Sequence, residues 1–277
     1  SQDNPNSSYD LGKIYRDGKL VKKDNKKAVI FFKKAASKYN TDANVELGHH
    51  YGFGWGVQKD LKKAFDYYLK AAHAYGNDDG RANYAVAHAF ALGLGVEQDA
   101  KQAFLYYQSA AKQGYAPAQD KMGDYYYYEN ELGLERNCEE AIHWYEKAAK
   151  QGDQSAQSQL GDLYISGECV EKNYELAFHW HQKAAEQGSL HSQANLGYMY
   201  SAGLGVEGNP TLGFQFSELA AKAGHPTAQF NLAELYRDGS SAVPKNIETA
   251  LYWFSLSADQ GDEESAVERD KLLKSIK

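Results

Sequence analysis

A short residue pattern recurs seven times along this chain. A small residue is followed four positions later by an apolar residue paired with a small one, and then by an aromatic residue, as in Ala43, Leu47-Gly48 and Tyr51. The seven starts are Ser7, Ala43, Ala82, Ala118, Ala156, Ser192 and Ala228, which lie 36 to 39 residues apart. A fixed period of this length is typical of arrays in which neighbouring repeats share a continuous core.

The second half of each repeat carries its own pattern. A small residue is followed by an aromatic pair and then by a small pair, as in Ala103, Tyr106-Tyr107 and Ala110-Ala111. Recurrence at i, i+3, i+4 and i+7 places these side chains on one face of an α-helix. Each repeat is therefore predicted to contain two helices. Because one pair cannot bury its own apolar face, the repeats must stack on one another.

Turn and capping residues mark the ends of the predicted helices. Turns of the form Gly-x-Gly-Val, such as Gly93 to Val96, follow the first helix, where glycine supplies the positive φ that ends it. Asp24, Asp60 and Asp99 precede the second helix, where a side-chain oxygen can accept from its free N–H groups.

With these features the chain resembles the Sel-1-like repeats, relatives of the tetratricopeptide repeats. The resemblance covers about residues 7–264 and implies an all-α fold, a right-handed α–α superhelix (solenoid) whose first helices line a concave surface. We expect one domain over residues 1–277. Its repeats would span 7–42, 43–81, 82–117, 118–155, 156–191, 192–227 and 228–264, with a polar capping helix over 265–277. In the fourth repeat, residues 127–137 replace the usual turn.

No motif in the sequence indicates catalysis or cofactor binding. The Gly93–Val96 turn has no preceding strand and no Lys-Ser/Thr, so it is not expected to bind phosphate. His49 and His50 are adjacent on a helix and face different directions, and no His or Cys motif has metal-ligand spacing. We expect surface or groove histidines, no catalytic residue, no cofactor, no metal and no enzymatic activity.

Charge is distributed unevenly along the chain. Residues 1–40 hold ten Lys/Arg and four Asp/Glu, whereas the remaining residues hold 20 and 33, so the net charges are +6 and −13. The first lysines flank apolar residues at helical spacing, which indicates a solvated helix face, and the acidic repeats would repel a phosphate backbone. Nucleic acid is therefore not an expected partner. No apolar run approaches the roughly 18 residues of a membrane span.

The two cysteines, Cys138 and Cys169, fall in inter-helix turns of neighbouring repeats. One bridge is geometrically feasible, but two thiols are the favoured interpretation, because two cysteines are too few for a disulfide framework. No signal peptide is visible in the sequence. The resemblance and the short, glycine-rich repeats favour a secreted or periplasmic bacterial protein over a cytoplasmic one.

The partner-binding face is expected on the first helices. The apolar residue of the first-helix pattern, Leu47 in the second repeat, defines a Leu position in every repeat. Residues two positions before and after it lie away from the apolar stripe and differ between repeats, as residues of a surface that contacts a partner would. Exposed aromatic residues make efficient anchors in such contacts, and carboxylates make the later groove acidic. The predicted partner-binding residues are His49, Tyr84, His88, Asp120, Asp124, Tyr127, Asp162, Tyr198, Phe230 and Glu234.

The sequence thus predicts a monomeric interaction scaffold that binds another protein or peptide segment carrying basic and apolar residues. Relatives implied by the resemblance act in host contact and signalling. Two alternatives stay open: an inhibitor or regulatory subunit of an enzyme, and a binder or weak hydrolase of peptidoglycan or β-lactam-like ligands. The β-lactam activity of disulfide-rich relatives is not carried over, because this chain lacks a cysteine pair in each repeat.

Overall fold

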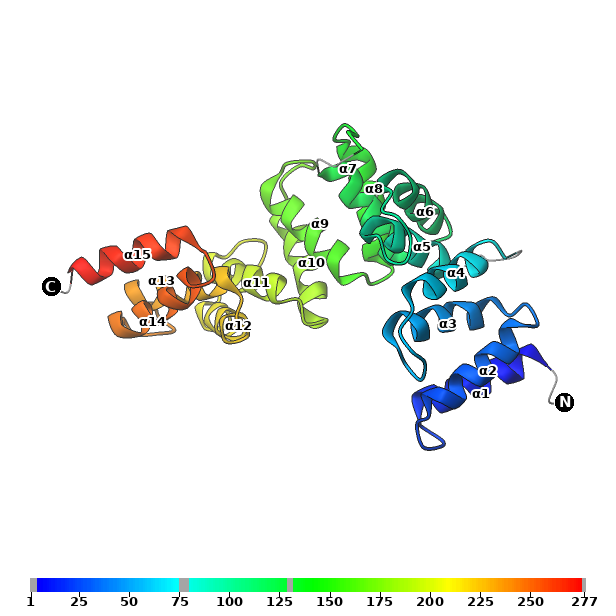
Figure 1. Ribbon diagram of the computed structural model, residues 1–277. Coiled ribbons are helices and arrows are strands. Elements are labelled where there is room, and N and C mark those ends of the chain that lie inside the picture. The colour runs from blue at the N-terminus through cyan, green and yellow to red at the C-terminus, as the bar shows by residue number, and fades with distance from the viewer. Residues whose placement is uncertain (1–3, 75–79, 129–131, 276–277) are drawn as a thin grey trace. The chain divides into compact units, whose positions relative to one another are not determined.

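The computed structural model describes residues 4–74, 80–128 and 132–275, and within these ranges it is built of fifteen α-helices with no strand (Figure 1). The helices pair in chain order as α1 (Pro5–Asp17) with α2 (Asn25–Ala36), α3 (Thr41–Phe53) with α4 (Leu61–Ala72), α5 (Arg81–Leu92) with α6 (Ala100–Lys112), α7 (Ala116–Tyr127) with α8 (Cys138–Lys150), α9 (Gln154–Ser166) with α10 (Tyr174–Glu186), α11 (Leu190–Ala202) with α12 (Pro210–Lys222), and α13 (Pro226–Asp238) with α14 (Ile247–Ala258). The last helix, α15 (Glu263–Ser275), has no partner of this kind.

The chain divides into two compact units, Ser1–Trp144 and Tyr145–Lys277. Within each unit, helices pack in sequence, the two members of a pair against each other and the second against the first helix of the next pair. This arrangement confirms the predicted all-α solenoid of stacked helix pairs. None of the described helices has the length and apolarity that a membrane crossing requires.

A glycine on the first helix seats an aromatic ring from the second. In the fifth repeat, a Cβ added at Gly161 would come within 2.6 Å of the imidazole of His181. Tyr68 covers Gly48 in the same way in the second repeat. The absence of a side chain lets the ring lie flat on the helix backbone, which explains why the Leu-Gly pair and the aromatic position recur together.

The predicted caps and turns are confirmed. The side chains of Asp24, Asp60 and Asp99 each accept a hydrogen bond of 3.0 Å from the backbone N–H three residues ahead. Gly93 ends α5 in the left-handed conformation with φ of 67°. The second glycine of the same turn, Gly95, presses against the carbonyl of Leu61 at the start of α4.

The two ends of the array differ from its middle. Leu11 is 41% exposed, whereas its counterpart Leu47 is fully buried against α2 of the preceding repeat. The same position of the pattern is therefore buried in the second repeat, where α2 covers it, and exposed in the first. At the other end α15 packs against the last pair through Leu272, which confirms the capping helix and starts it two residues earlier than expected.

Two sequence expectations concern the turn regions. Both Cys138 and Cys169 are disulfide-bonded and neither is a free thiol, so the favoured interpretation as two thiols is wrong. Residues 129–131 of the unusual fourth-repeat turn lie outside the described residues.

Candidate functional site

A pocket of about 470 Å³ lies between the second and third repeats in the first unit. Helices α3, α4 and α5 supply most of its walls, and Tyr115 closes one side. We call it the aromatic pocket. Its lining comprises Val45, His49, Gly52, Phe53, Lys59, Leu61, Ala64, Phe65, Tyr68, Arg81, Tyr84, Ala85, His88, Ala89, Leu94 and Tyr115.

Three of the predicted binding residues meet in this pocket. Tyr84 and His88 lie four residues apart on α5, so they share one face of that helix, and their rings stack with centroids 6.4 Å apart. The ring of Tyr84 also packs edge-on against that of Tyr115 at 5.2 Å. Across the pocket, His49 of α3 packs against Tyr68 of α4 at 5.5 Å. Rings thus form a fixed wall around an open space.

The lining of the pocket is largely apolar and includes two cationic residues. Burial lowers the pKa of His49 and raises the pKa of Tyr68, so both side chains are neutral at neutral pH. Lys59 and Arg81 are the charged residues of the lining, and Arg81 forms an ion pair with Asp42 of α3. A concave, largely apolar wall with few polar groups is the usual form of a binding pocket.

One aromatic residue at the edge of the pocket escaped the sequence prediction. Phe53 is 64% exposed and stacks on Trp55, itself 44% exposed, with ring centroids 4.7 Å apart. Phe53 is the last residue of α3, and Trp55 lies in the turn that follows, where the repeat pattern sets an expectation only for the glycines. Two exposed aromatic residues on either side of Gly54 were the available signal, because core packing does not require them there.

A second, smaller hollow lies in the second unit. Its volume is about 320 Å³, and its lining includes the predicted residues Tyr198 and Glu234 together with Asp238. Ser217 of α12 stands where other repeats place a ring, and Gly213 stands where most place alanine. The backbones of α11 and α12 therefore approach closely, since a Cβ at Gly213 would lie 2.9 Å from the carbonyl oxygen of Gly197. We call this space the acidic hollow.

The remaining carboxylates of the predicted row are less accessible than expected. Asp120 is 5% exposed, so the expectation of a surface position is wrong. Asp120 lies two positions before the Leu position, and residues in this row face the next repeat. Val45 has the same place in the second repeat and is buried against Ala71 and Ala82. Asp124 forms an ion pair of 2.6 Å with Lys121, one turn away on α7.

The other predicted residues also have neighbours within the protein. Asp162 is bound by the imidazole of His191 at 2.8 Å, and Glu234 by the guanidinium of Arg237 at 3.0 Å. The ring of Phe230 packs against Phe254 at 5.7 Å, which places it at the edge of the core. The Tyr127 ring lies 4.4 Å from the guanidinium carbon of Arg136.

Two histidines expected at the surface are buried. His50 is fully buried, and its Nδ1 lies 2.6 Å from the carbonyl oxygen of Trp55. His181 is fully buried because it occupies the ring position over Gly161. Among the residues that the structure describes, no group of three or more His, Cys, Asp or Glu side chains could hold a metal ion.

Comparison with known families accounts for the whole repeat pattern. The Sel1 repeat matches seven consecutive ranges, 5–40, 41–75, 80–115, 116–153, 154–189, 190–225 and 226–262. The chain belongs to the Sel1 repeat family. Each matched range begins about two residues before the repeat start expected from the sequence, where the helix itself begins.

Solved structures with the same fold include two Sel1-repeat proteins. One is c5321, a protective antigen present in uropathogenic Escherichia coli strains displaying an SLR fold, at 32% identity and a TM-score of 0.83 over 97% of this chain. This chain spans 56% of the length of that protein. The other is a Sel1 repeat protein from Oxalobacter formigenes, at 27% identity and a TM-score of 0.65 over 97% of this chain and 76% of that one. No curated protein matches the chain.

Sel1-repeat proteins generally mediate protein–protein interactions and are typically non-enzymatic scaffolds. The first-helix residues that meet in the aromatic pocket are consistent with this role of the family.

Proposed function

We propose that this Sel1-repeat protein is a non-catalytic scaffold that binds a segment of a partner protein, with an apolar side chain of the partner in the aromatic pocket. One observation carries the proposal: His49, Tyr84 and His88, from two successive first helices, line one open space of about 470 Å³. A pocket of that size admits a large apolar side chain with part of its backbone.

The physical character of the pocket favours a protein anchor. Tyr84 is held by rings on two sides, so little conformational entropy is lost when a partner packs against it. Tyrosine residues fixed in this way are frequent centres of binding energy in interfaces. Phe53 at the edge adds exposed apolar area that a partner segment would cover.

The acidic hollow is the proposed binding site for a basic side chain of the partner. Glu234 and Asp238 line it beside the half-exposed Tyr198, and Arg237 neutralises part of their charge. A lysine or arginine of the partner would contact these carboxylates from the open side. The proposed ligand of the scaffold therefore carries both apolar and basic residues, and the scaffold acts as a monomer.

The cellular location of the protein is proposed from its similarity to a Sel1-repeat protein. The similar c5321 is a protective antigen, which supports a secreted or periplasmic bacterial protein that contacts a host or a signalling partner. Its identity with this chain is 32% over just over half of its length.

A peptide-display selection on the full chain tests the proposal. Peptides recovered on the wild-type protein are expected to contain a large apolar residue, and an Ala85→Phe variant, which fills the aromatic pocket without removing a packed ring, should bind them at least about tenfold more weakly. Lys101→Phe, on the exposed side of α6, is the matched control and should bind normally. Equal binding by wild type and Ala85→Phe would overturn the proposal.

A further inference from the structure

Tyr39 has a backbone conformation that L-residues rarely adopt. Its φ is 64°, the one positive φ of a non-glycine residue within the described parts of the chain. Five later repeats have glycine at the same place, after the second helix, at Gly114, Gly152, Gly188, Gly224 and Gly261. A Cβ is disfavoured in this conformation relative to glycine, so the first repeat retains a tyrosine at an energetic disadvantage.

Packing does not compensate for this disadvantage. The Tyr39 side chain is 94% exposed, more than any other large hydrophobic residue in the described structure. An uncompensated backbone outlier is a reason to look for a functional role nearby.

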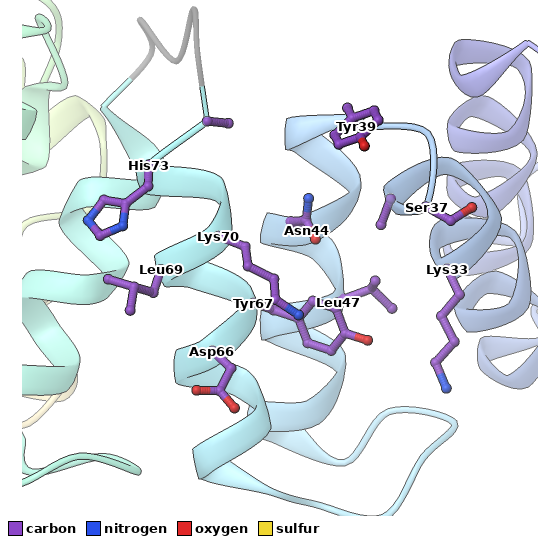
Figure 2. A pocket seen from close by; sticks show the side chains of 12 residues that line it. Lys33, Ser37, Tyr39, Asn44, Leu47, Asp66, Tyr67, Leu69, Lys70 and His73 are labelled. Carbon is purple, nitrogen blue, oxygen red and sulfur yellow. The ribbon is translucent and has the colours of Figure 1, made fainter.

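Tyr39 stands at the edge of a hollow of about 920 Å³ between α2 and α4, which we call the basic hollow. Figure 2 shows Tyr39 on the turn at the top of the view, Tyr67 and Lys70 on α4, and Lys33 across the hollow on α2. Asn44 and Leu47 of α3 lie between the two sides. No residue of this lining also lines the aromatic pocket.

The two lysines of the basic hollow are held by rings instead of by carboxylates. The Nζ of Lys33 lies 5.6 Å from the Tyr51 ring centroid, and the Nζ of Lys70 lies 5.2 Å from that of Tyr67. In the described residues neither lysine forms an ion pair, and Asp66 is the one carboxylate in the lining. A cation over an aromatic ring keeps its charge available to an anion that approaches from solvent.

The surroundings add positive charge. Helix α2 contains four lysines and no acidic residue, and the first 40 residues carry a net charge of +6 in a chain whose total is −7. The potential at the basic hollow therefore attracts negative charge, whereas most of the remaining surface repels it.

We propose that the basic hollow is a second interaction surface, which binds an acidic protein segment with Tyr39 as its aromatic anchor. Carboxylates of the segment would contact Lys33 and Lys70, and an apolar group of the segment would pack on the exposed ring. This proposal is independent of the role of the aromatic pocket. It explains why a tyrosine occupies a position where glycine is favoured by the backbone.

The test is a display selection of random twelve-residue peptides on the full-length protein, followed by binding measurements with the recovered peptides. We expect one class rich in Asp and Glu that binds Ala85→Phe normally. A Lys33→Ala/Lys70→Ala variant should bind this class about tenfold more weakly in low salt, with a flatter salt dependence. Tyr39→Gly should bind it about tenfold more weakly although it folds more stably.

Lys183→Ala is the matched control. Lys183 of the second unit occupies the helical position that Lys70 has in the second repeat, and its Nζ lies 5.5 Å from the ring centroid of Trp180. This variant should bind the acidic peptides as wild type does. The proposal is overturned if no acidic class is recovered, or if the double lysine variant binds that class unchanged. It is also overturned if duplex DNA binds more tightly than the peptides and loses that binding in the same variant, because the surface would then recognise phosphate.

Discussion

His181 shows how one position of the repeat can carry a special property. Its imidazole takes the place that Phe32, Tyr68, Tyr107 and Tyr145 take in earlier repeats, and it is fully buried. Burial lowers its pKa to about 4, although Asp162 at 3.5 Å favours the protonated ring and His191 opposes it. Its Nδ1 lies 3.2 Å from the hydroxyl of Ser192. A titrating group therefore sits in the core of the fifth repeat.

This burial predicts acid sensitivity. In the unfolded chain the histidine binds a proton below about pH 6.5, whereas in the folded protein it does so only near pH 4. The stabilising contribution is complete above pH 6.5 and is lost as the pH falls, by about 3 kcal/mol at pH 4. His181→Phe should remove that part of the loss. Urea unfolding at pH 7, 5 and 4 measures it, and equal pH dependence of the two proteins would contradict the prediction.

Tyr39 predicts a stabilising substitution. Replacing it with glycine relieves a left-handed conformation that costs about 1–2 kcal/mol, and this exceeds the roughly 0.5–1 kcal/mol by which glycine favours the unfolded chain. The free energy of unfolding of Tyr39→Gly should therefore rise by up to about 1 kcal/mol. Tyr39→Ala, which keeps a Cβ in the same conformation, is the control and should gain nothing. Denaturant midpoints decide between these outcomes.

At the scale of the element, the turn between paired helices is a packing surface as well as a connection. Gly54 and Gly93 end the first helices at positive φ, as any C-capping glycine does. Two residues later comes a second glycine, Gly56 or Gly95. A Cβ added there would overlap the backbone carbonyl of the first residue of the second helix in the preceding repeat, Asn25 or Leu61. The turn therefore fixes the spacing of successive repeats.

This contact predicts a large difference between two Gly→Ala substitutions. Gly95→Ala combines a left-handed alanine with an overlap on the Leu61 carbonyl, so it should destabilise the protein by about 3 kcal/mol or more. Gly114 has a φ of 87° but no atom within 4 Å of an added Cβ, so Gly114→Ala should cost only about 1 kcal/mol. Urea midpoints of the two variants provide the comparison, and similar costs would show that the Gly95 contact is not tight.

At the scale of the molecule, stability is expected to be local. Each helix contacts mainly its neighbours in sequence, so the effects of a change should decay along the array. The last repeat depends on α15, which covers the buried Phe254 through Leu272 and pairs Glu268 with Arg237 at 3.0 Å.

Deleting residues 263–277 tests this locality. Amide exchange in α13 and α14 should accelerate by at least about tenfold, because the apolar face of the last pair becomes exposed, while exchange in α1 to α6 should not change. Hydrogen exchange with mass spectrometry on the full and shortened chains measures both regions. A uniform acceleration over the whole chain would show one cooperative unit in place of a local one.

The candidate site was predictable only in part. His49, Tyr84 and His88 were selected from their helical positions, and the structure brings them into one pocket. Asp120 was selected by the same rule and is buried, because its accessibility depends on how closely the next repeat packs. Phe53 was missed because it ends a helix and Tyr39 because it lies in a turn, and at both places the repeat pattern sets no expectation.

The sequence by itself determined the helices, their caps and their order, because these depend on contacts within one repeat or between neighbours that the period of the pattern reveals. Tertiary structure decided where empty space remains. The aromatic pocket, the acidic hollow and the basic hollow each arise from the distance between helices of adjacent repeats, which depends on side-chain volumes from several elements at once. Which residues of an exposed-looking row meet a partner therefore follows from packing and not from the spacing of residues along the chain.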